Sequence, residues 1–315
     1  MLFIGIDLGT SACKLLLVGE DGTIQNEVTK EYPLSFPHPG WAEQRPEEWW
    51  DAVVTGVPEL LRGFDANDVA GIGSGGQMHG LVALDEHDHV IRPAILWNDG
   101  RTFKEVDYLN NVVGKDRLSE LTANIAFAGF TAPKLLWMRE NEPENFEKIA
   151  KIMLPKDYLT YRLTGVHACD YSDASGMLLL DVQHKRWSQE MLEICGVSER
   201  QMPQLFESFA VVGRLTKEAA QTLGLSRAQT FFSVLLPQTA KRVLLPVTNE
   251  VITLVKDTAL ASTIAVADLM SQAERQVSNS SSIEPYIVAM LIYLVINGVV
   301  EQLCKLAERK FNYYQ

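Results

Sequence analysis

Residues 2–11 restrict the fold of this chain more than any other stretch. An apolar run rich in β-forming residues leads into Asp7, a turn of Gly9, Thr10 and Ser11 follows, and a second apolar run heads back. This pattern predicts a β-hairpin whose tip carries a carboxylate, two hydroxyls and backbone N–H groups around Gly9. Such a tip can hold phosphate oxygens and the water shell of Mg²⁺, although the same residues also suit an ordinary turn.

The composition of the chain changes near Glu218. Residues 218–315 contain eight basic and eight acidic residues, so the whole net charge of -12 lies on residues 1–217. All six Trp and all six His also precede Glu218. We therefore expect two domains, residues 1–217 and residues 218–315. Because phosphate neutralisation needs a basic surface, we expect no nucleic-acid partner.

The four cysteines are scattered without metal-ligand spacing. Their pattern predicts reduced thiols, and neither a disulfide framework nor a metal site. The N-terminus lacks the charged leader and apolar core of a secretory signal. We therefore expect residues 1–217 to lie in the cytoplasm.

Strands and helices alternate over the first hundred residues, which predicts an α/β domain with a helix beginning near Pro46. The later pattern is mainly helical. We expect helices at 101–113, 115–121, 132–141 and 155–164, strands at 90–96 and 177–181, and a polar loop at 170–176.

Two short polar passages suit a polyhydroxyl ligand. Gln77, Met78 and His79 lie on a glycine-flanked turn, where an amide and an imidazole could bind hydroxyls. The run from Trp97 through Asn98 and Asp99 to Arg101 combines an aromatic face with polar edges. The alternatives are a solvated surface histidine for the first passage and an Asp-Gly turn before a helix for the second.

Together with residues 129–141 and 170–176, these motifs resemble the FGGY carbohydrate kinases, and within that family the xylulokinases. The resemblance covers about residues 1–225. It implies a ribonuclease-H-like domain of the actin/hexokinase type within the α/β class. It also implies the ATP-dependent phosphorylation of D-xylulose to D-xylulose 5-phosphate, with Mg-ATP as the cofactor.

The resemblance also assigns roles to individual residues. Asp7 would help to position Mg²⁺ and the phosphates of ATP. The residues implied for binding the cofactor are Gly9, Thr10, Ser11 and Lys14, and those implied for binding the sugar are Gln77, Met78, His79, Trp97, Asn98 and Asp99.

The chain departs from that family after Ser226. The family continues with a glycine-rich passage whose Asp is the general base, followed by a domain that binds adenosine. Here the remaining aspartates are Asp257 and Asp268, and neither has a glycine neighbour. We therefore expect the chain to be inactive or severely impaired as a kinase.

Residues 218–315 resemble part of a polar amino-acid ABC permease. Glu218, Ala219 and Ala220, with the spacing to Pro237, are similar to the EAA loop that docks on the ATPase subunit. Residues 286–300 carry no charge, which predicts an apolar helix over about 286–303 at the inner membrane or, alternatively, a buried helix in water. We expect an all-α, partly transmembrane segment, so the alternative functions are a permease component and an inert fusion.

Overall fold

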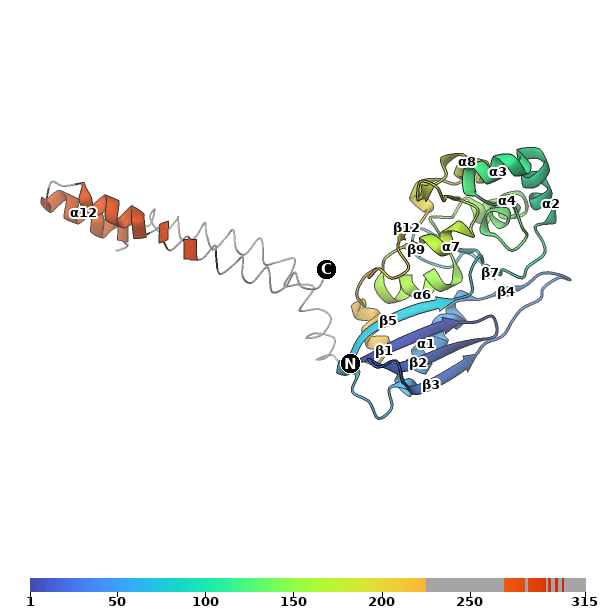
Figure 1. Cartoon of the computed structure of the whole chain (residues 1–315), viewed down its shortest axis with the longest axis horizontal. Coiled ribbons are helices and arrows are strands. Elements are labelled where there is room, and N and C mark those ends of the chain that lie inside the picture. The colour runs from blue at the N-terminus through green and yellow to red at the C-terminus, as the bar shows by residue number, and fades with distance from the viewer. Residues whose placement is uncertain (225–268, 281–282, 293, 296–297, 300–301, 303–315) are drawn as a thin grey trace. The chain divides into compact units, whose positions relative to one another are not determined.

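The computed structural model describes residues 1–224, 269–280, 283–292, 294–295, 298–299 and 302 (Figure 1). The chain divides into two compact units, Met1–Thr230 and Phe231–Gln315. The boundary predicted from composition, between residues 217 and 218, falls at the start of the short helix α9 (Lys217–Thr222), which belongs to the first unit.

A four-stranded sheet in the order β3-β2-β1-β5 is the largest sheet of the first unit and lies along its lower side in Figure 1. Strands β1 (Leu2–Leu8), β2 (Ala12–Gly19) and β3 (Ile24–Glu31) are antiparallel neighbours, whereas β5 (Val69–Gly76) runs parallel to β1. The predicted hairpin at residues 2–18 is therefore present.

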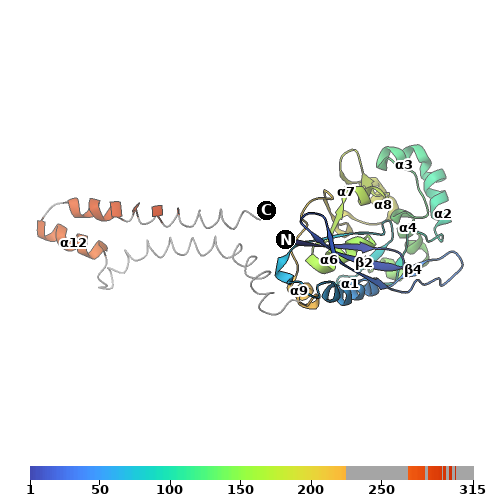
Figure 2. The same cartoon turned by 60° about the horizontal axis from the view of Figure 1, so that its bottom comes forward.

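One face of this sheet is buried under helices. Side chains alternate along a strand, so every second residue of β1 and β2 points into this core. Helices α1 (Pro46–Leu60) and α6 (Pro155–Thr164) and the short α9 contribute to the same core (Figure 2). The main members of the core are Ile4, Ile6, Leu8, Cys13, Leu15, Leu17, Trp49, Val53, Val57, Leu60, Tyr158, Leu159, Leu163, Ala219 and Leu223. The intervening residues face the opposite side, where Phe3, Asp7 and Lys14 are exposed and the others are partly buried.

A second layer of short elements and its own core complete the first unit. Four two-stranded sheets pair β4 (Glu43–Gln44) with β7 (Ala94–Ile95), β6 (Val82–Leu84) with β8 (Lys151–Met153), β9 (Ala168–Asp170) with β12 (Gln204–Phe206), and β10 (Leu180–Asp181) with β11 (Arg186–Trp187). The helices here are α2 (Phe103–Asp107), α3 (Lys115–Thr122), α4 (Thr131–Asn141), α5 (Pro143–Phe146), α7 (Tyr171–Ser175) and α8 (Gln189–Cys195), with 3₁₀ turns η1 (Ala66–Asp68) and η3 (Glu199–Gln201).

Several predicted elements differ from those observed. The helix expected at 101–113 is a short α2 followed by a π-helical turn, η2 (Tyr108–Gly114). The loop expected at 170–176 contains helix α7, because the Asp170 carboxylate accepts a hydrogen bond from the backbone N–H of Asp173 and caps the helix. The strands expected at 90–96 and 177–181 shrink to the two-residue strands β7 and β10.

The described part of the second unit is helical. Helix α12 spans Leu269–Ser280, and residues 284–292 are also helical. The apolar run predicted to cross a membrane falls partly outside the described residues. Within the residues that are described, no helix combines the length and the apolar character that a membrane span requires.

Candidate functional site

The tip of the β1–β2 hairpin and the glycine-rich passage after β5 meet at one edge of the sheet. Leu8 lies opposite Gly76 in the parallel register, and the backbone N–H of Gln77 donates to the Leu8 carbonyl at 2.7 Å. Gly76 has φ +139°, and a Cβ there would lie 2.4 Å from the Leu8 carbonyl oxygen, so only glycine fits. We call residues 9–11 and 77–79 together the hairpin edge.

The amide of Gln77 is held in one orientation at this edge. Its Nε2 donates to the Gly9 carbonyl at 3.3 Å and to Gln44 Oε1 at 3.2 Å. Gln44 in turn donates to the Thr10 carbonyl at 2.6 Å. The Gln77 side chain is only 7% exposed, and its Oε1 has no hydrogen-bond partner among the described residues. The fold therefore presents a fixed acceptor without a donor.

His79 adopts a left-handed backbone conformation with φ +63°. The hydroxyl of Thr131 donates to its carbonyl at 3.0 Å, and its ring lies 4.9 Å from the ring of Phe130. Its Nδ1 is buried and makes no hydrogen bond of good geometry within the described part of the chain, although the Gly176 backbone lies beside the ring and partly offsets the fall in the pKa of His79. Burial, followed by the charge of Lys134, lowers the pKa of His79, so the imidazole is neutral at pH 7.

The side chains around these two polar groups are apolar and accessible. Met78 is 44% exposed and Trp97 is 47% exposed. The indole Nε1 of Trp97 donates to Thr10 Oγ1 at 3.1 Å, which joins Trp97 to the hairpin edge. A Cβ on Gly129 would lie 2.9 Å from the Trp97 carbonyl oxygen, so the loop before α4 packs closely behind this residue. Asn98 follows Trp97 and is exposed.

Asp99 is placed differently from the other residues predicted to bind sugar. It is 2% exposed, and its carboxylate accepts hydrogen bonds from Arg101 Nε at 2.9 Å and Arg101 Nη2 at 2.8 Å. The backbone N–H groups of Ala42 and Arg101 also donate to it, at 2.6 Å and 2.9 Å. Both oxygens are thus engaged within the fold, which fits the alternative of an Asp-Gly turn.

Asp7 and Lys14 face each other across the hairpin, on the exposed side of the sheet. Lys14 Nζ lies 3.1 Å from Glu27 Oε2. Below them, burial and then the charge of Asp7 raise the pKa of the Cys13 thiol to about 12, so this thiol stays protonated. Asp7 thus offers an exposed carboxylate two residues before the turn that begins at Gly9.

The residues of the turn fit part of a Mg-phosphate site. Thr10 and Ser11, which carry the two hydroxyls, follow Asp7 by three and four residues. The Gly9 N–H, in contrast, donates to the Ala12 carbonyl at 3.0 Å. That N–H is therefore not free, contrary to the prediction. No group of three potential metal ligands occurs among the residues that the structure covers. A carboxylate that holds the metal through bound water fits these donors, whereas a cage made by the protein alone does not.

Several residues that position the site could not be recognised as such from their own motifs. Lys134 is fully buried, and its ammonium donates to the carbonyls of Ala128 (3.1 Å), Gly129 and Phe130 (2.9 Å). Burial lowers the pKa of Lys134 to about 7. These bonds hold the loop that carries Phe130 against His79. In the sequence, the feature that points to Lys134 is its place within the 129–141 motif.

Helix α7 rests on a buried ion cluster. Lys156 Nζ lies 2.6 Å from Asp157, 2.7 Å from Asp170 and 3.2 Å from Asp173. Asp170 begins the helix and Gly176 ends it, next to the His79 ring. The cluster thus fixes the wall on which His79 rests.

Comparison with known proteins gives two family matches. Residues 2–238 match the N-terminal domain of the FGGY family of carbohydrate kinases, and residues 209–313 match the inner membrane component of binding-protein-dependent transport systems. The resemblance to a xylulokinase fused to a permease segment is therefore confirmed. Both matches include residues 209–238.

Individual relatives agree with the first match. The chain is 45% identical over 225 residues to the xylulose kinase of Escherichia coli, an alignment that covers 71% of this chain and 46% of the relative. The structure of a xyloylose kinase from Brucella ovis matches with 43% identity and a TM-score of 0.66, over 69% of this chain and 46% of that one. The xylulose kinase from Rhodospirillum rubrum matches with 30% identity and a TM-score of 0.69, over 72% and 47%.

These solved structures confirm a carbohydrate-kinase fold of the actin/hexokinase type for the first unit. The chain spans slightly less than half the length of the relatives it matches. From its matched domain and these relatives, the chain belongs to the FGGY family of carbohydrate kinases.

Proposed function

We propose that the chain binds D-xylulose at the hairpin edge, as the N-terminal half of a xylulokinase-type sugar kinase. One observation carries the proposal. Two polar atoms of the hairpin edge, Gln77 Oε1 and His79 Nδ1, are buried and make no hydrogen bond of good geometry in the described structure, and the same edge carries the exposed Met78 and, through Thr10, the exposed Trp97. Burying an unpaired polar atom is costly, so a hydroxylated ligand that binds both atoms would offset that cost. We choose D-xylulose as the sugar because these relatives are named xylulose kinases.

In this proposal each residue that the resemblance implies for the sugar has a role. Gln77 and His79 bind sugar hydroxyls, Met78 and Trp97 line the apolar side of the sugar, and Asn98 adds an exposed amide. Asp99 acts indirectly by holding the loop of Trp97 through Arg101.

Asp7 would position Mg-ATP through metal-bound water, and the hydroxyls of Thr10 and Ser11 would bind phosphate oxygens. Gly9 shapes the turn, and Lys14 adds positive charge near it. When bound, Mg²⁺ neutralises charge on the phosphates during phosphoryl transfer.

We further propose that this chain binds sugar without phosphorylating it efficiently. The family's general base would follow residue 225, where the sequence instead matches a transport component. Loss of a general base alone costs about 10²–10⁴ in rate. In a coupled assay for ADP release, we expect D-xylulose to add no turnover above the rate without sugar. Turnover comparable to that of an ordinary sugar kinase would overturn this part.

Titration calorimetry with D-xylulose tests the binding proposal. We expect His79→Ala to weaken D-xylulose binding by about tenfold or more, since a buried hydrogen bond is lost. His87→Ala is the matched control, because His87 lies in an exposed turn. Equal affinity of His79→Ala and the wild type would exclude His79 from the site.

The match at residues 209–313 favours a second candidate, a transporter component. In that case residues 1–217 would remain in the cytoplasm, residues 286–303 would contact the inner membrane, and residues 218–237 would dock on an ABC ATPase. Co-purification of the chain with such an ATPase from membranes would support this function. Recovery of the whole chain without detergent and without an ATPase would leave the inert fusion as the remaining alternative.

A further inference from the structure

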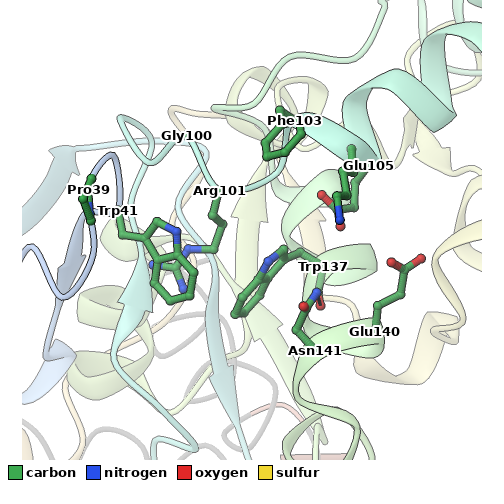
Figure 3. Close-up of a pocket in the computed structure, with 10 residues that line it drawn as sticks. Pro39, Trp41, Gly100, Arg101, Phe103, Glu105, Trp137, Glu140 and Asn141 are labelled. Carbon is green, nitrogen blue, oxygen red and sulfur yellow. Dashed lines mark hydrogen bonds between the residues drawn. The ribbon is translucent and has the colours of Figure 1, made fainter.

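A pocket of about 450 Å³ lies between helices α2 and α4 and the loop before β4, apart from the hairpin edge. Figure 3 shows Trp41 and Arg101 on one side, facing Glu105, Trp137, Glu140 and Asn141 on the other. We propose that this pocket, here called the Trp137 pocket, is a second binding site for a neutral polyhydroxylated ligand such as a monosaccharide.

Two buried polar atoms of opposite character belong to side chains that line the pocket. Glu105 is 4% exposed, and its Oε2 accepts no hydrogen bond from any described residue. The Arg101 side chain is fully buried, and its Nη1 likewise finds no acceptor in the described structure. A ligand that satisfies both atoms must offer a donor and an acceptor. A hydroxyl group offers both.

The charges around the pocket favour a neutral ligand. The guanidinium of Arg101 is already matched by Asp99 at 2.8 Å and Glu43 at 2.7 Å, so an anion gains little from it. Lys104 also lines the pocket, but its charge acts on Glu105, and with Glu140 the opposite wall carries two carboxylates to one ammonium, which disfavours an anion. A cation would in turn meet the unpaired N–H of Arg101.

The size and the aromatic walls also suit a sugar. The volume falls within the usual range of about 300–1,000 Å³ for small-molecule sites. The rings of Trp41 and Trp137 lie 5.2 Å apart at 85°, and Arg101 stacks 3.8 Å from the Trp41 ring centre. Two perpendicular indoles held by a buried cation form a rigid apolar surface for the C–H face of a sugar ring.

The Trp137 pocket shares no lining residue with the hairpin edge. The proposal therefore does not depend on D-xylulose binding at Gln77 and His79. The two sites are tied covalently, since Arg101 follows Trp97 by four residues and fixes Asp99 in the same loop. Occupation of the pocket would stabilise the loop that carries Trp97.

Saturation-transfer NMR on the full chain tests the proposal with three pyranoses matched in size: D-glucose, D-glucuronate and D-glucosamine. The His79→Ala background weakens binding at the hairpin edge. We expect D-glucose to bind with a dissociation constant at least about fivefold lower than those of both charged sugars. Glu105→Met should weaken D-glucose binding by about tenfold or more, because the acceptor is lost. Glu147→Met, which removes an exposed carboxylate outside the pocket, is the matched control.

A second readout separates a lost ligand site from a lost fold. An unpaired buried carboxylate destabilises a protein, so Glu105→Met should raise the thermal midpoint while it abolishes the shift caused by D-glucose. Glu105→Gln, which keeps the shape, should bind D-glucose more weakly than the wild type. Unchanged D-glucose binding in folded Glu105→Met would overturn the proposal, as would tighter binding of either charged sugar or an absence of saturation transfer from D-glucose.

Discussion

Gly176→Ala is a direct test of the role of His79. Gly176 has φ -80° and ψ -4°, a conformation that alanine adopts without strain. The added Cβ, however, would lie 2.2 Å from His79 Cε1 and 2.5 Å from His79 Nδ1. The substitution therefore displaces the imidazole by about 1 Å while leaving every residue of the hairpin edge chemically intact.

The expected loss of stability and of D-xylulose binding depends on how firmly the fold holds His79. Its left-handed backbone and the hydrogen bond from Thr131 limit the movement of the main chain, and Phe130 lies beside the ring. Overpacking of this kind costs about 1–3 kcal/mol. The replacement of glycine by alanine in a compatible conformation offsets about 0.4–1 kcal/mol. We expect the free energy of unfolding to fall by about 0–2.5 kcal/mol and D-xylulose binding to weaken about tenfold.

The assay is titration calorimetry with D-xylulose, combined with urea unfolding of the same samples. Gly73→Ala is the matched control, because Gly73 lies in β5 without a positive φ, and an added Cβ there would meet no described atom within 4 Å. That control should bind D-xylulose like the wild type. If folded Gly176→Ala also binds like the wild type, the position of the His79 ring has no part in sugar binding, and the reasoning fails.

Three further predictions concern residues that support the site. Lys134→Met removes the ammonium from three partly buried carbonyls, of which that of Ala128 keeps a hydrogen bond from Thr102, so we expect urea unfolding to show a loss of at least about 2 kcal/mol, and D-xylulose binding to weaken as the loop before α4 loosens. Because the pKa of His79 is lowered in the folded chain, its imidazole takes up a proton near pH 6.5 in the unfolded chain but only at a lower pH in the folded chain. Stability is therefore lost as the pH falls below 6.5, and His79→Ala should reduce this loss in pH-dependent unfolding. Ala220→Glu buries a carboxylate at a position with 0% exposure, so thermal unfolding of the first unit should show a loss of about 3 kcal/mol or more, whereas exposed Gln221→Glu should be neutral.

The sequence predicted the hairpin at residues 2–18 and helix α6, whose ends are set by residues adjacent in the chain. The hairpin at residues 2–18 follows from alternating apolar residues around a glycine turn, and it is present. Helix α6 spans Pro155–Thr164, the range that the sequence predicted, with proline in its first turn and Gly165 at φ +71° directly after its end. The juxtaposition of Gly9 with Gln77 could be expected only from the family resemblance, because parallel pairing of β1 and β5 is not visible in either segment alone.

Other features arise from contacts between distant segments. Gln44 lies 33 residues before Gln77, yet it fixes the amide of Gln77. Gly176 abuts His79 only because Lys156 gathers Asp170 and Asp173 beneath α7. The composition of residues 170–176 favours a loop. The Asp170 cap is local to this segment, whereas the ion pairs with Lys156 that hold the helix come from elsewhere in the fold. No local pattern encodes such contacts.

Helix α9 bears on both family matches at once. Thr216 Oγ1 accepts from the backbone N–H of Ala219 and caps the helix. Ala219 and Leu223 are then buried in the core shared with α6, Ala220 is also buried, and Gly224 with φ +86° follows. A helix that docks on a partner must expose the face it docks with, but here Ala219 of the permease-like motif packs in the core of the kinase unit and Ala220 is buried beside it. One set of side chains cannot fill that core and an external interface at the same time. Docking of this segment on an ATPase through Ala219 therefore requires α9 to leave the kinase unit, which uncovers the part of the core that Ala219 and Leu223 fill.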